Sequence, residues 1–367
     1  MRIFQVINVR WFNATAWYAI TLSRLLADAG HEVLVLTQAD TDAERAAKAL
    51  GLTTVSVDLN TTNPVRFARA IGHIIQLLRA HRPEIVNCHR GEGFFLWGLL
   101  KLAGFRFKLV RTRGDQRPPR CDAFNRWLHA NAADAVVVTN RFMADYFLKR
   151  MRTPPKGVWL IQGGVDTERF AFDPEGREAV RAEFGFGPDD LVVGLLGRFD
   201  RVKGHRELIR AVARLRAEGL ANVRLFLIGF DTAMTRSEIE ADIEAAKVGD
   251  ITRISGRRDD VAACVSALDV GVVASLWSEA IARSALEIMA AGRPLVSTSV
   301  GVMPDLVSPP ALVAPGDEAA LARAIAEVTK PEVRAEVLDR QKRIMSQLTL
   351  EEFLKRSLNL YSSLLDG

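Results

Sequence analysis

Short runs rich in Val, Ile and Leu alternate along the chain with longer segments in which apolar residues recur at helical spacing. The runs have the length of strands. Strands that alternate with helices form βαβ units, so the pattern predicts parallel sheets covered by helices on both faces. In the first part of the chain the expected strands are 2–9, 31–37, 54–59, 84–89, 108–113, 135–140 and 157–162.

A connector punctuated by Pro, Gly and charged residues interrupts the alternation within residues 152–177. Beyond it, the residues from Glu318 onward are nearly all helical in pattern, and the expected strands are 191–198, 223–229, 251–256, 270–275 and 294–300. We therefore expect an α/β protein with two doubly wound, Rossmann-like parallel-sheet domains, residues 1–155 and 156–350, facing across a cleft. Because such sheets bind ligands beyond the carboxyl ends of their strands, the residues that follow strands are the candidates for chemistry.

The composition narrows the class of protein. With 49% hydrophobic and 25% charged residues, the 367-residue chain matches an average globular protein. Its apolar stretches are all short: the run 94–100 is far below the roughly 20 residues that cross a bilayer. Its N-terminus lacks the apolar core of a signal peptide. The three cysteines, Cys88, Cys121 and Cys264, have no metal-ligand spacing. These features favour a cytoplasmic protein.

Basic residues are concentrated in the first part of the chain. Residues 1–155 hold 22 Lys and Arg against 12 Asp and Glu, whereas the remainder is net acidic. The densest basic run is 101–120, and the helix expected over 64–80 carries basic residues among apolar ones. Such a surface is either an ordinary solvated one or a contact for a polyanion: a phosphorylated molecule, the inner face of an anionic membrane, or nucleic acid. The charge pattern leaves these alternatives open.

The segment GRFDRVKG, residues 197–204, directly follows an expected strand. It combines glycines, which let a ligand approach the backbone, with two cations, Arg198 and Lys203, and a helix is expected over 205–217. Arg offers a planar fork, Lys a point charge, and the helix N-terminus adds positive potential, so the segment suits a diphosphate. The alternative is an ordinary strand-to-helix turn with two solvated cations.

A second segment, residues 275–294, begins where another expected strand ends and contains Glu279 and Glu287. A helix that begins near Ala280 places Glu279 at its mouth and Glu287 about two turns inside. Carboxylates so placed can accept hydrogen bonds from sugar hydroxyls, while the free N–H groups of the first turn face a phosphate. The alternative is a pair of ordinary helix carboxylates.

Together these motifs resemble the second domain of family 4 retaining glycosyltransferases of the GT-B fold. The resemblance rests on their order: Gly-Arg-x4-Lys-Gly, a strand ending at Gly229, a strand ending at Gly256, then Ser-x3-Glu-x7-Glu-x3-Ala-Gly-x-Pro. The first half agrees in AGHEVLVLT, PEIVNCH and ADAVVVTN, and the segment IQGGVDTERF is similar to the family's interdomain element.

The resemblance implies a retaining, metal-independent enzyme without a cofactor, which moves a sugar from a UDP-, GDP- or ADP-linked donor to a glycan or lipid-linked acceptor of cell-envelope polysaccharide or lipopolysaccharide. It implies that Arg198 and Lys203 hold the donor diphosphate and that Glu279 binds the transferred sugar. The last helix, 351–367, is expected to pack back on the N-terminal, acceptor-side domain. The further donor-binding positions are Gly197, Gly229, Gly256, Ile281, Ala282, Ala285 and Glu287.

The chain departs from the family in the acceptor-side loops. The loop after the first strand, 8–17, has no glycine, and Arg113 stands about where many members carry a histidine. Bulky residues of that first loop either shape an acceptor pocket or simply pack. The acceptor-side candidates are Trp11, Asn13, His89 and Arg113.

Other functions are weighed against this one. A nucleotide-sugar 2-epimerase of similar fold needs acid and base groups that the Arg, Lys and Glu set does not supply. A nicotinamide-dependent dehydrogenase needs a Gly-x-Gly-x-x-Gly motif after the first strand, and this chain has none there. A non-catalytic membrane- or polyanion-binding module is the third rival; a nucleic-acid partner is not expected. The Asp40-Thr41-Asp42 triplet suggests a metal-dependent transferase, but helix capping explains it better.

Overall fold

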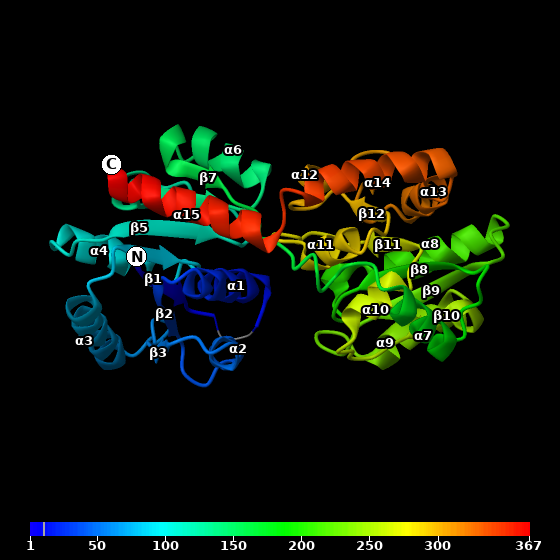
Figure 1. Ribbon diagram of the computed structural model, residues 1–367, viewed down its shortest axis with the longest axis horizontal. Helices are drawn as coiled ribbons and strands as arrows, with labels where there is room; N and C mark the ends of the chain where they lie inside the picture. The colour runs from blue at the N-terminus through cyan, green and yellow to red at the C-terminus, as the bar shows by residue number, and fades with distance from the viewer. Residues whose placement is uncertain (10–11) are drawn as a thin grey trace. The chain divides into compact units, whose positions relative to one another are not determined.

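The computed structural model describes residues 1–9 and 12–367, so the candidate Trp11 lies outside the described residues. The chain forms two compact units (Figure 1). Unit 1 comprises Met1–Gly163 together with Leu350–Gly367, and unit 2 comprises Gly164–Thr349. Within the described residues, every helix is too short or too polar to cross a membrane.

Unit 1 is built on a seven-stranded sheet of order β3-β2-β1-β4-β5-β6-β7. All pairings are parallel. Since β1 pairs with both β2 and β4, the order of the strands reverses at β1. The strands are β1 (Arg2–Ile7), β2 (Glu32–Thr37), β3 (Thr54–Ser56), β4 (Ile85–Cys88), β5 (Lys108–Arg113), β6 (Ala135–Val138) and β7 (Val158–Leu160).

Helices cover this sheet because each has one apolar stripe. Side chains of α3 and α4 share one core cluster with the central strands, so these two helices cover the same face. The α-helices of unit 1 are α1 (Ala14–Asp28), α2 (Asp42–Ala49), α3 (Pro64–His81), α4 (Phe94–Leu102), α5 (Ala123–Trp127), α6 (Arg141–Lys149) and α15 (Leu350–Asp366).

Helix α15, red in Figure 1, lies along the sheet of unit 1 although unit 2 separates it from the rest in sequence. Its Phe353 ring packs on Tyr18 of α1, with ring centroids 4.6 Å apart. Its buried Tyr361 hydroxyl accepts hydrogen bonds from the side-chain amides of Gln5 (3.3 Å) and Asn87 (2.9 Å), which lie on β1 and β4. One face of the helix is thus part of the core of unit 1.

Unit 2 is built on a six-stranded parallel sheet of order β10-β9-β8-β11-β12-β13. Its strands are β8 (Leu191–Leu196), β9 (Val223–Ile228), β10 (Thr252–Ile254), β11 (Val270–Val273), β12 (Leu295–Thr298) and β13 (Leu312–Val313). Its α-helices are α7 (Pro174–Phe184), α8 (His205–Ala217), α9 (Arg236–Ala245), α10 (Val261–Ser266), α11 (Arg283–Ala290), α12 (Met303–Leu306), α13 (Glu318–Val328) and α14 (Pro331–Met345). The order of the strands reverses at β8, which lies between β9 and β11.

The expected class, two doubly wound parallel-sheet units, is confirmed. Each expected strand is present, usually one or two residues shorter than its apolar run. The two-residue strand β13 was not predicted. The Asp40-Thr41-Asp42 triplet does cap a helix: the Thr41 hydroxyl accepts a hydrogen bond from the N–H of Glu44 in the first turn of α2.

Candidate active site

The loop after β8 holds the basic motif of unit 2. It runs from Gly197 through a single turn, Arg201–Lys203, to Gly204, and α8 then begins at His205. The Asp200 side chain shapes the turn by accepting a hydrogen bond from the N–H of Val202 at 3.1 Å. The motif therefore lies at the carboxyl end of β8, beside the point where the strand order reverses, which is where open sheets bind ligands.

Two glycines allow the neighbouring loops to touch this one. A Cβ on Gly229, just after β9, would lie 2.1 Å from the carbonyl oxygen of Gly197. A Cβ on Gly204 would lie 2.0 Å from the carbonyl oxygen of Ala274, after β11, and Gly204 has a φ of +70°. Larger residues at either position would separate the loops, so both glycines are needed for this close backbone packing.

Lys203 and Glu279 meet at this edge of the sheet. The Lys203 Nζ lies 2.6 Å from the Glu279 Oε1, although 76 positions separate the residues. The same carboxylate oxygen accepts a hydrogen bond from the Ser275 hydroxyl at 2.5 Å. Glu279 and Ser275 are buried, whereas the Lys203 side chain is partly exposed. The pair thus has a buried acidic floor and a basic group that solvent reaches.

The helix after this pair begins later than predicted. Helix α11 starts at Arg283 rather than near Ala280, because Ala282 has a left-handed backbone with a φ of +51°. Glu279 therefore precedes the helix by a full turn, and its carbonyl oxygen accepts a hydrogen bond from the N–H of Val302. Of the three donor-binding positions expected on this segment, only Ala285 lies in the first turn of α11; Ile281 and Ala282 lie before the helix.

The remaining predicted donor-site charges have partners of their own. The half-exposed Arg198 pairs with Asp200, Nη2 to Oδ2 at 2.8 Å. Glu287 pairs with Arg283 one turn earlier on α11, Oε1 to Nε at 2.8 Å. Burial raises the pKa of Glu287 above its usual value. Gly256 follows β10 with a φ of +72°. The structure thus joins Lys203 to Glu279 directly and gives Arg198 and Glu287 separate ion pairs.

Sequence reasoning missed three neighbours of these residues. Ser275 is the first residue of the Ser-x3-Glu motif, and its role as a buried donor to Glu279 is one that the motif alone does not show. His205 packs its ring against Phe199, and burial lowers its pKa to about 4, so it is neutral. Trp277 lies two residues before Glu279, and 55% of it is exposed.

In unit 1, the described acceptor-side candidates lie at or near the starts of helices and at the ends of strands. Asn13 caps α1 by accepting a hydrogen bond from the N–H of Ala16. His89, after β4, is fully buried, and its Nε2 lies 2.6 Å from the Gln5 Oε1. Burial lowers the pKa of His89 to about 3 and keeps the ring neutral. Arg113, the last residue of β5, pairs with Asp115 at 2.6 Å.

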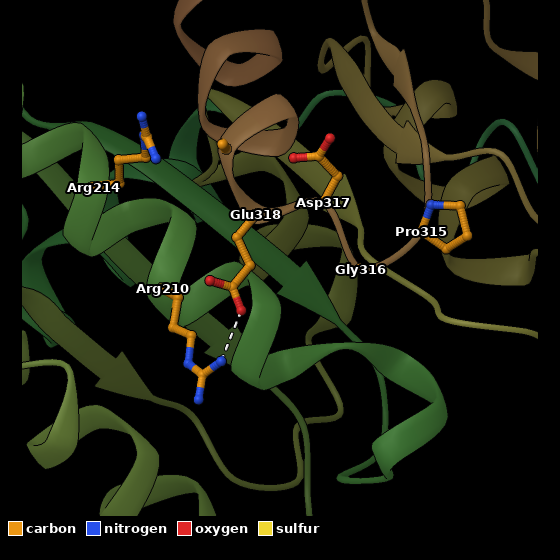
Figure 2. A pocket seen from close by; sticks show the side chains of 7 residues that line it. Arg210, Arg214, Pro315, Gly316, Asp317 and Glu318 are labelled. Carbon is orange, nitrogen blue, oxygen red and sulfur yellow. Dashed lines mark hydrogen bonds and ion pairs between the residues drawn. The ribbon is translucent and has the colours of Figure 1, made fainter.

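A groove elsewhere in unit 2 does not share these features. It lies between α8 and the loop that leads into α13, and Figure 2 shows Arg210 and Glu318 pointing toward one another across it. They form an ion pair at 2.9 Å, and the Asp317 side chain caps α13. Because these charges serve one another and the helix, we assign no function to the groove.

The edge formed by the β8 and β11 loops brings basic side chains next to a buried carboxylate. It offers a lysine, a nearby exposed arginine and a buried carboxylate within a few residues of strand ends. The residues that the structure describes contain no group of three or more His, Cys, Asp and Glu side chains that could hold a metal ion. The positive charges at this edge are those of Arg198 and Lys203.

Comparison with known proteins places this chain in a family. The family described as "Glycosyltransferase Family 4" matches residues 15–169, and the family described as "Glycosyl transferases group 1" matches residues 190–330. A 2-deoxystreptamine glucosyltransferase of Streptomyces kanamyceticus is 30% identical over 293 residues, 72% of this chain and 73% of that protein. A D-inositol 3-phosphate glycosyltransferase of Saccharomonospora viridis is 32% identical over 247 residues, 64% of this chain and 56% of that protein.

Solved structures share the fold of this chain. The solved structure of Anabaena HepE in complex with UDP and glucose matches with a TM-score of 0.81 at 19% identity, over 99% of this chain and 100% of that one. Two doubly wound parallel sheets in one chain are the GT-B fold. The chain belongs to glycosyltransferase family 4, the glycosyltransferases of group 1.

Proposed function

We propose that this glycosyltransferase transfers a sugar from a nucleoside-diphosphate donor to a glycan or lipid-linked acceptor of the cell envelope, with retention of the anomeric configuration. The observation that carries the proposal is the Lys203–Glu279 pair at 2.6 Å, at the strand-end edge of unit 2. A cation suited to a diphosphate is thereby held next to a carboxylate suited to a sugar hydroxyl.

The chemistry requires little more than fixed charge. Cleavage of the bond between the sugar C1 and the diphosphate oxygen builds negative charge on the leaving group. Lys203 and Arg198 stabilise that charge because they are held in place before the reaction. The acceptor oxygen forms its bond to C1 on the face that the diphosphate leaves, and the acceptor's proton passes to a diphosphate oxygen. No protein nucleophile takes part in this scheme.

The donor lies along the loops after β8, β9 and β10 in this proposal. Gly197 gives the nucleotide access to the backbone because it carries no side chain, and Gly229 lets the loop after β9 lie directly against Gly197. Glu279 accepts a hydrogen bond from the transferred sugar and Glu287 from the ribose, with the N–H of Ala285 facing the phosphate at the start of α11. The first donors to try are UDP-sugars, since the similar HepE structure holds UDP and glucose.

The decisive experiment combines a ligand screen with two variants. A thermal-shift panel of UDP-, GDP- and ADP-sugars identifies the donor, because a ligand that binds the folded protein raises its melting temperature. With that donor, Lys203→Ala and Glu279→Gln are each expected to lower transfer by about 100-fold or more, since a single preorganised group commonly contributes that much. Circular dichroism verifies that the variants are folded.

The exposed Lys330–Glu327 pair, also 2.6 Å apart in unit 2, provides matched controls. Lys330→Ala and Glu327→Gln are expected to leave transfer unchanged, because Glu327 lies in the last turn of α13 and Lys330 just after that helix, away from the loops after β8 and β11. Full turnover by Lys203→Ala or Glu279→Gln would contradict the site assignment. NMR of the product determines its anomeric configuration, and an inverted product would rule out retention. A 2-epimerase would instead convert the nucleotide sugar without any acceptor.

The reaction is expected to need no metal ion, because Arg198 and Lys203 supply the charge that a divalent cation would otherwise neutralise. Treatment with EDTA followed by gel filtration should therefore leave the rate of transfer nearly unchanged. The measurement is the initial rate before and after treatment, with and without added Mn²⁺. Loss of the rate on chelation and its recovery with Mn²⁺ would show a metal-dependent enzyme.

We also propose that unit 1 contacts the inner face of an anionic membrane. Helix α4 exposes Phe95, Leu99 and Leu102 to 39%, 49% and 67%, a spacing that lines them up on one side. Helix α3, which covers the same face of the sheet, exposes basic side chains. Apolar groups beside basic ones are typical of surfaces that lie on anionic lipid. The basic residues are Arg66, Arg69, His73 and Arg79.

A further inference from the structure

Three arginines of unit 1 converge at the carboxyl ends of neighbouring strands. Arg111 and Arg113 belong to β5, and Arg90 lies in the loop after β4. The arginines differ in depth: Arg111 is 0% exposed, Arg113 is 7% exposed, and one third of the Arg90 side chain is accessible. The cluster therefore has a buried floor and an open rim.

Two carboxylates serve the three cations. Glu92 binds Arg90 with both oxygens, at 2.6 and 3.1 Å, and Asp115 binds the Arg113 Nη2 at 2.6 Å. Both carboxylates are rim residues, with about a third of their side chains exposed. The third cation, Arg111, has only a distant ion pair, Nη2 to the Asp115 Oδ2 at 3.9 Å.

Arg111 is also incompletely hydrogen-bonded. Its Nη1 donates to the backbone carbonyls of Cys88, at 2.9 Å, and of Thr112. Its Nε and Nη2 are buried without a hydrogen-bond partner, and so is the Nε of Arg113. Buried N–H groups of a charged side chain are costly to leave unpaired, so such groups usually have a partner.

The electrostatics agree with this account. Burial, with repulsion from Arg113, lowers the pKa of Arg111 to about 9. Burial also lowers the pKa of Arg113, and repulsion from Arg90 adds to this decrease. A site that holds cations close together against their mutual repulsion is stabilised by an anion. The Gly91 backbone adjoins Arg111, since a Cβ on Gly91 would lie 3.8 Å from its Nη2, so no side chain from this loop position fills the space.

We propose that this arginine cluster, Arg90, Arg111 and Arg113, binds a phosphate monoester carried by the sugar acceptor. The inference rests on the proposed transferase function, because it specifies the acceptor. Arg90 and Arg113 contact the phosphate with their forks, a geometry that matches its oxygens. The phosphate takes the places of Glu92 and Asp115, and Arg111 beneath supplies the uncompensated positive charge.

The first test is a titration with inorganic phosphate at constant ionic strength, followed by melting temperature. The wild type is expected to show a saturable rise, because phosphate binds the folded protein only. Arg113→Gln should weaken the apparent affinity at least tenfold, whereas Asp115→Asn should strengthen it because a competing carboxylate is removed. The exposed Arg24→Gln on α1, where Arg24 pairs with Asp28, is the matched control and should behave as wild type. No saturable rise, or weaker binding by Asp115→Asn, would overturn the proposal.

The donor site must be separated from this one, since Lys203 also attracts phosphate. The phosphate response is expected to persist unchanged in Lys203→Ala and to be weakened at least tenfold in Arg113→Gln. The opposite pattern would assign the response to unit 2 and overturn the inference. The two proposals fail independently: the transferase proposal fails if no nucleotide sugar is turned over, and this one fails on phosphate binding alone.

Replacing the buried Arg111 provides a second, independent test of whether its charge serves anion binding. Arg111→Met replaces the charge with an apolar side chain of similar length, so its melting temperature in phosphate-free buffer should exceed that of the wild type. Its phosphate-induced rise should be smaller. A variant that is less stable and keeps the full phosphate response would show that Arg111 is only structural.

Competition with inorganic phosphate identifies the kind of molecule that carries the phosphate monoester. Glucose 6-phosphate, with glucose as its neutral control, represents a soluble acceptor, and phosphatidate vesicles, with phosphatidylcholine as control, represent a lipid headgroup. Competition with inorganic phosphate by one of the two phosphates, but not by its control, supports the proposal and assigns the source. Competition by neither would overturn it.

Discussion

At the scale of single residues, three buried histidines make stability depend on pH. Burial lowers the pKa of His89 to about 3 and those of His129 and His205 to about 4. In the unfolded chain each titrates near 6.5. Because unfolding takes up protons below that value, the stabilisation is complete above about pH 6.5 and decreases as the pH falls toward 4.

The two units should respond unequally, since His89 and His129 belong to unit 1 and His205 to unit 2. Toward pH 5 the histidines are expected to cost unit 1 about 3 kcal/mol per pH unit and unit 2 about 1 kcal/mol. Hydrogen exchange of the β4 and β8 amides at pH 6.5 and pH 5 measures the opening free energies. Equal losses in both strands would contradict this assignment.

Single residues also show what a sequence can reveal about a site. Arg198, Lys203 and Glu279 could be nominated because charged residues directly after apolar runs lie at the ligand-binding edge of a sheet. The 2.6 Å contact of Lys203 with Glu279, and the Ser275 hydrogen bond, depend on strand order and loop packing across 76 positions, which no local pattern encodes. Arg113 was nominated, but its buried neighbour Arg111 looked like an ordinary strand residue.

At the scale of elements, α15 contributes to stability through one buried hydroxyl. Tyr361→Phe removes the acceptor for the amides of Gln5 and Asn87 in the interior of unit 1. Leaving buried donors unpaired costs about 1–3 kcal/mol, so the variant should unfold at a lower urea concentration. Tyr146→Phe is the control: its hydroxyl donates to a partly buried carbonyl of Pro119 that water can reach, and its effect should be smaller.

Equal shifts of the two urea midpoints would show that the Tyr361 hydrogen bonds add nothing beyond ring packing.

Element positions were predictable wherever the apolar pattern was long. Helix α8 begins and ends at the expected residues, because Gly204 precedes it and its apolar residues recur regularly. Strand β13 escaped prediction because two residues carry no periodicity. The start of α11 was predicted wrongly because the left-handed backbone of Ala282, an alanine with no local preference for it, is imposed by the packing of the surrounding loops.

At the scale of the whole molecule, the basic excess of residues 1–155 predicts binding to anionic vesicles. Sedimentation with vesicles containing phosphatidylglycerol should retain the protein, while phosphatidylcholine vesicles should not. Leu99→Glu on α4 should reduce the partition coefficient about tenfold, since an inserted leucine contributes about 1.5–3 kcal/mol. High salt should weaken binding by screening the basic helices.

Leu50→Glu, at the end of α2, is the control because Leu50 is also exposed, to 45%, but lies away from the α4 stripe. It should bind as the wild type does. Retention on uncharged vesicles, or equal losses in the two glutamate variants, would be incompatible with a membrane contact through α3 and α4.

The return of the chain to unit 1 at Leu350 has a consequence for biosynthesis. A ribosome completes all of unit 2 before it releases Phe353 and Tyr361, so the first sheet emerges early and waits with its Gln5 and Asn87 amides uncovered. A nascent chain stalled within unit 2 would therefore present an incomplete unit 1 to chaperones and proteases. Unit 1 is completed only when the last residues, Leu350–Gly367, have been synthesised.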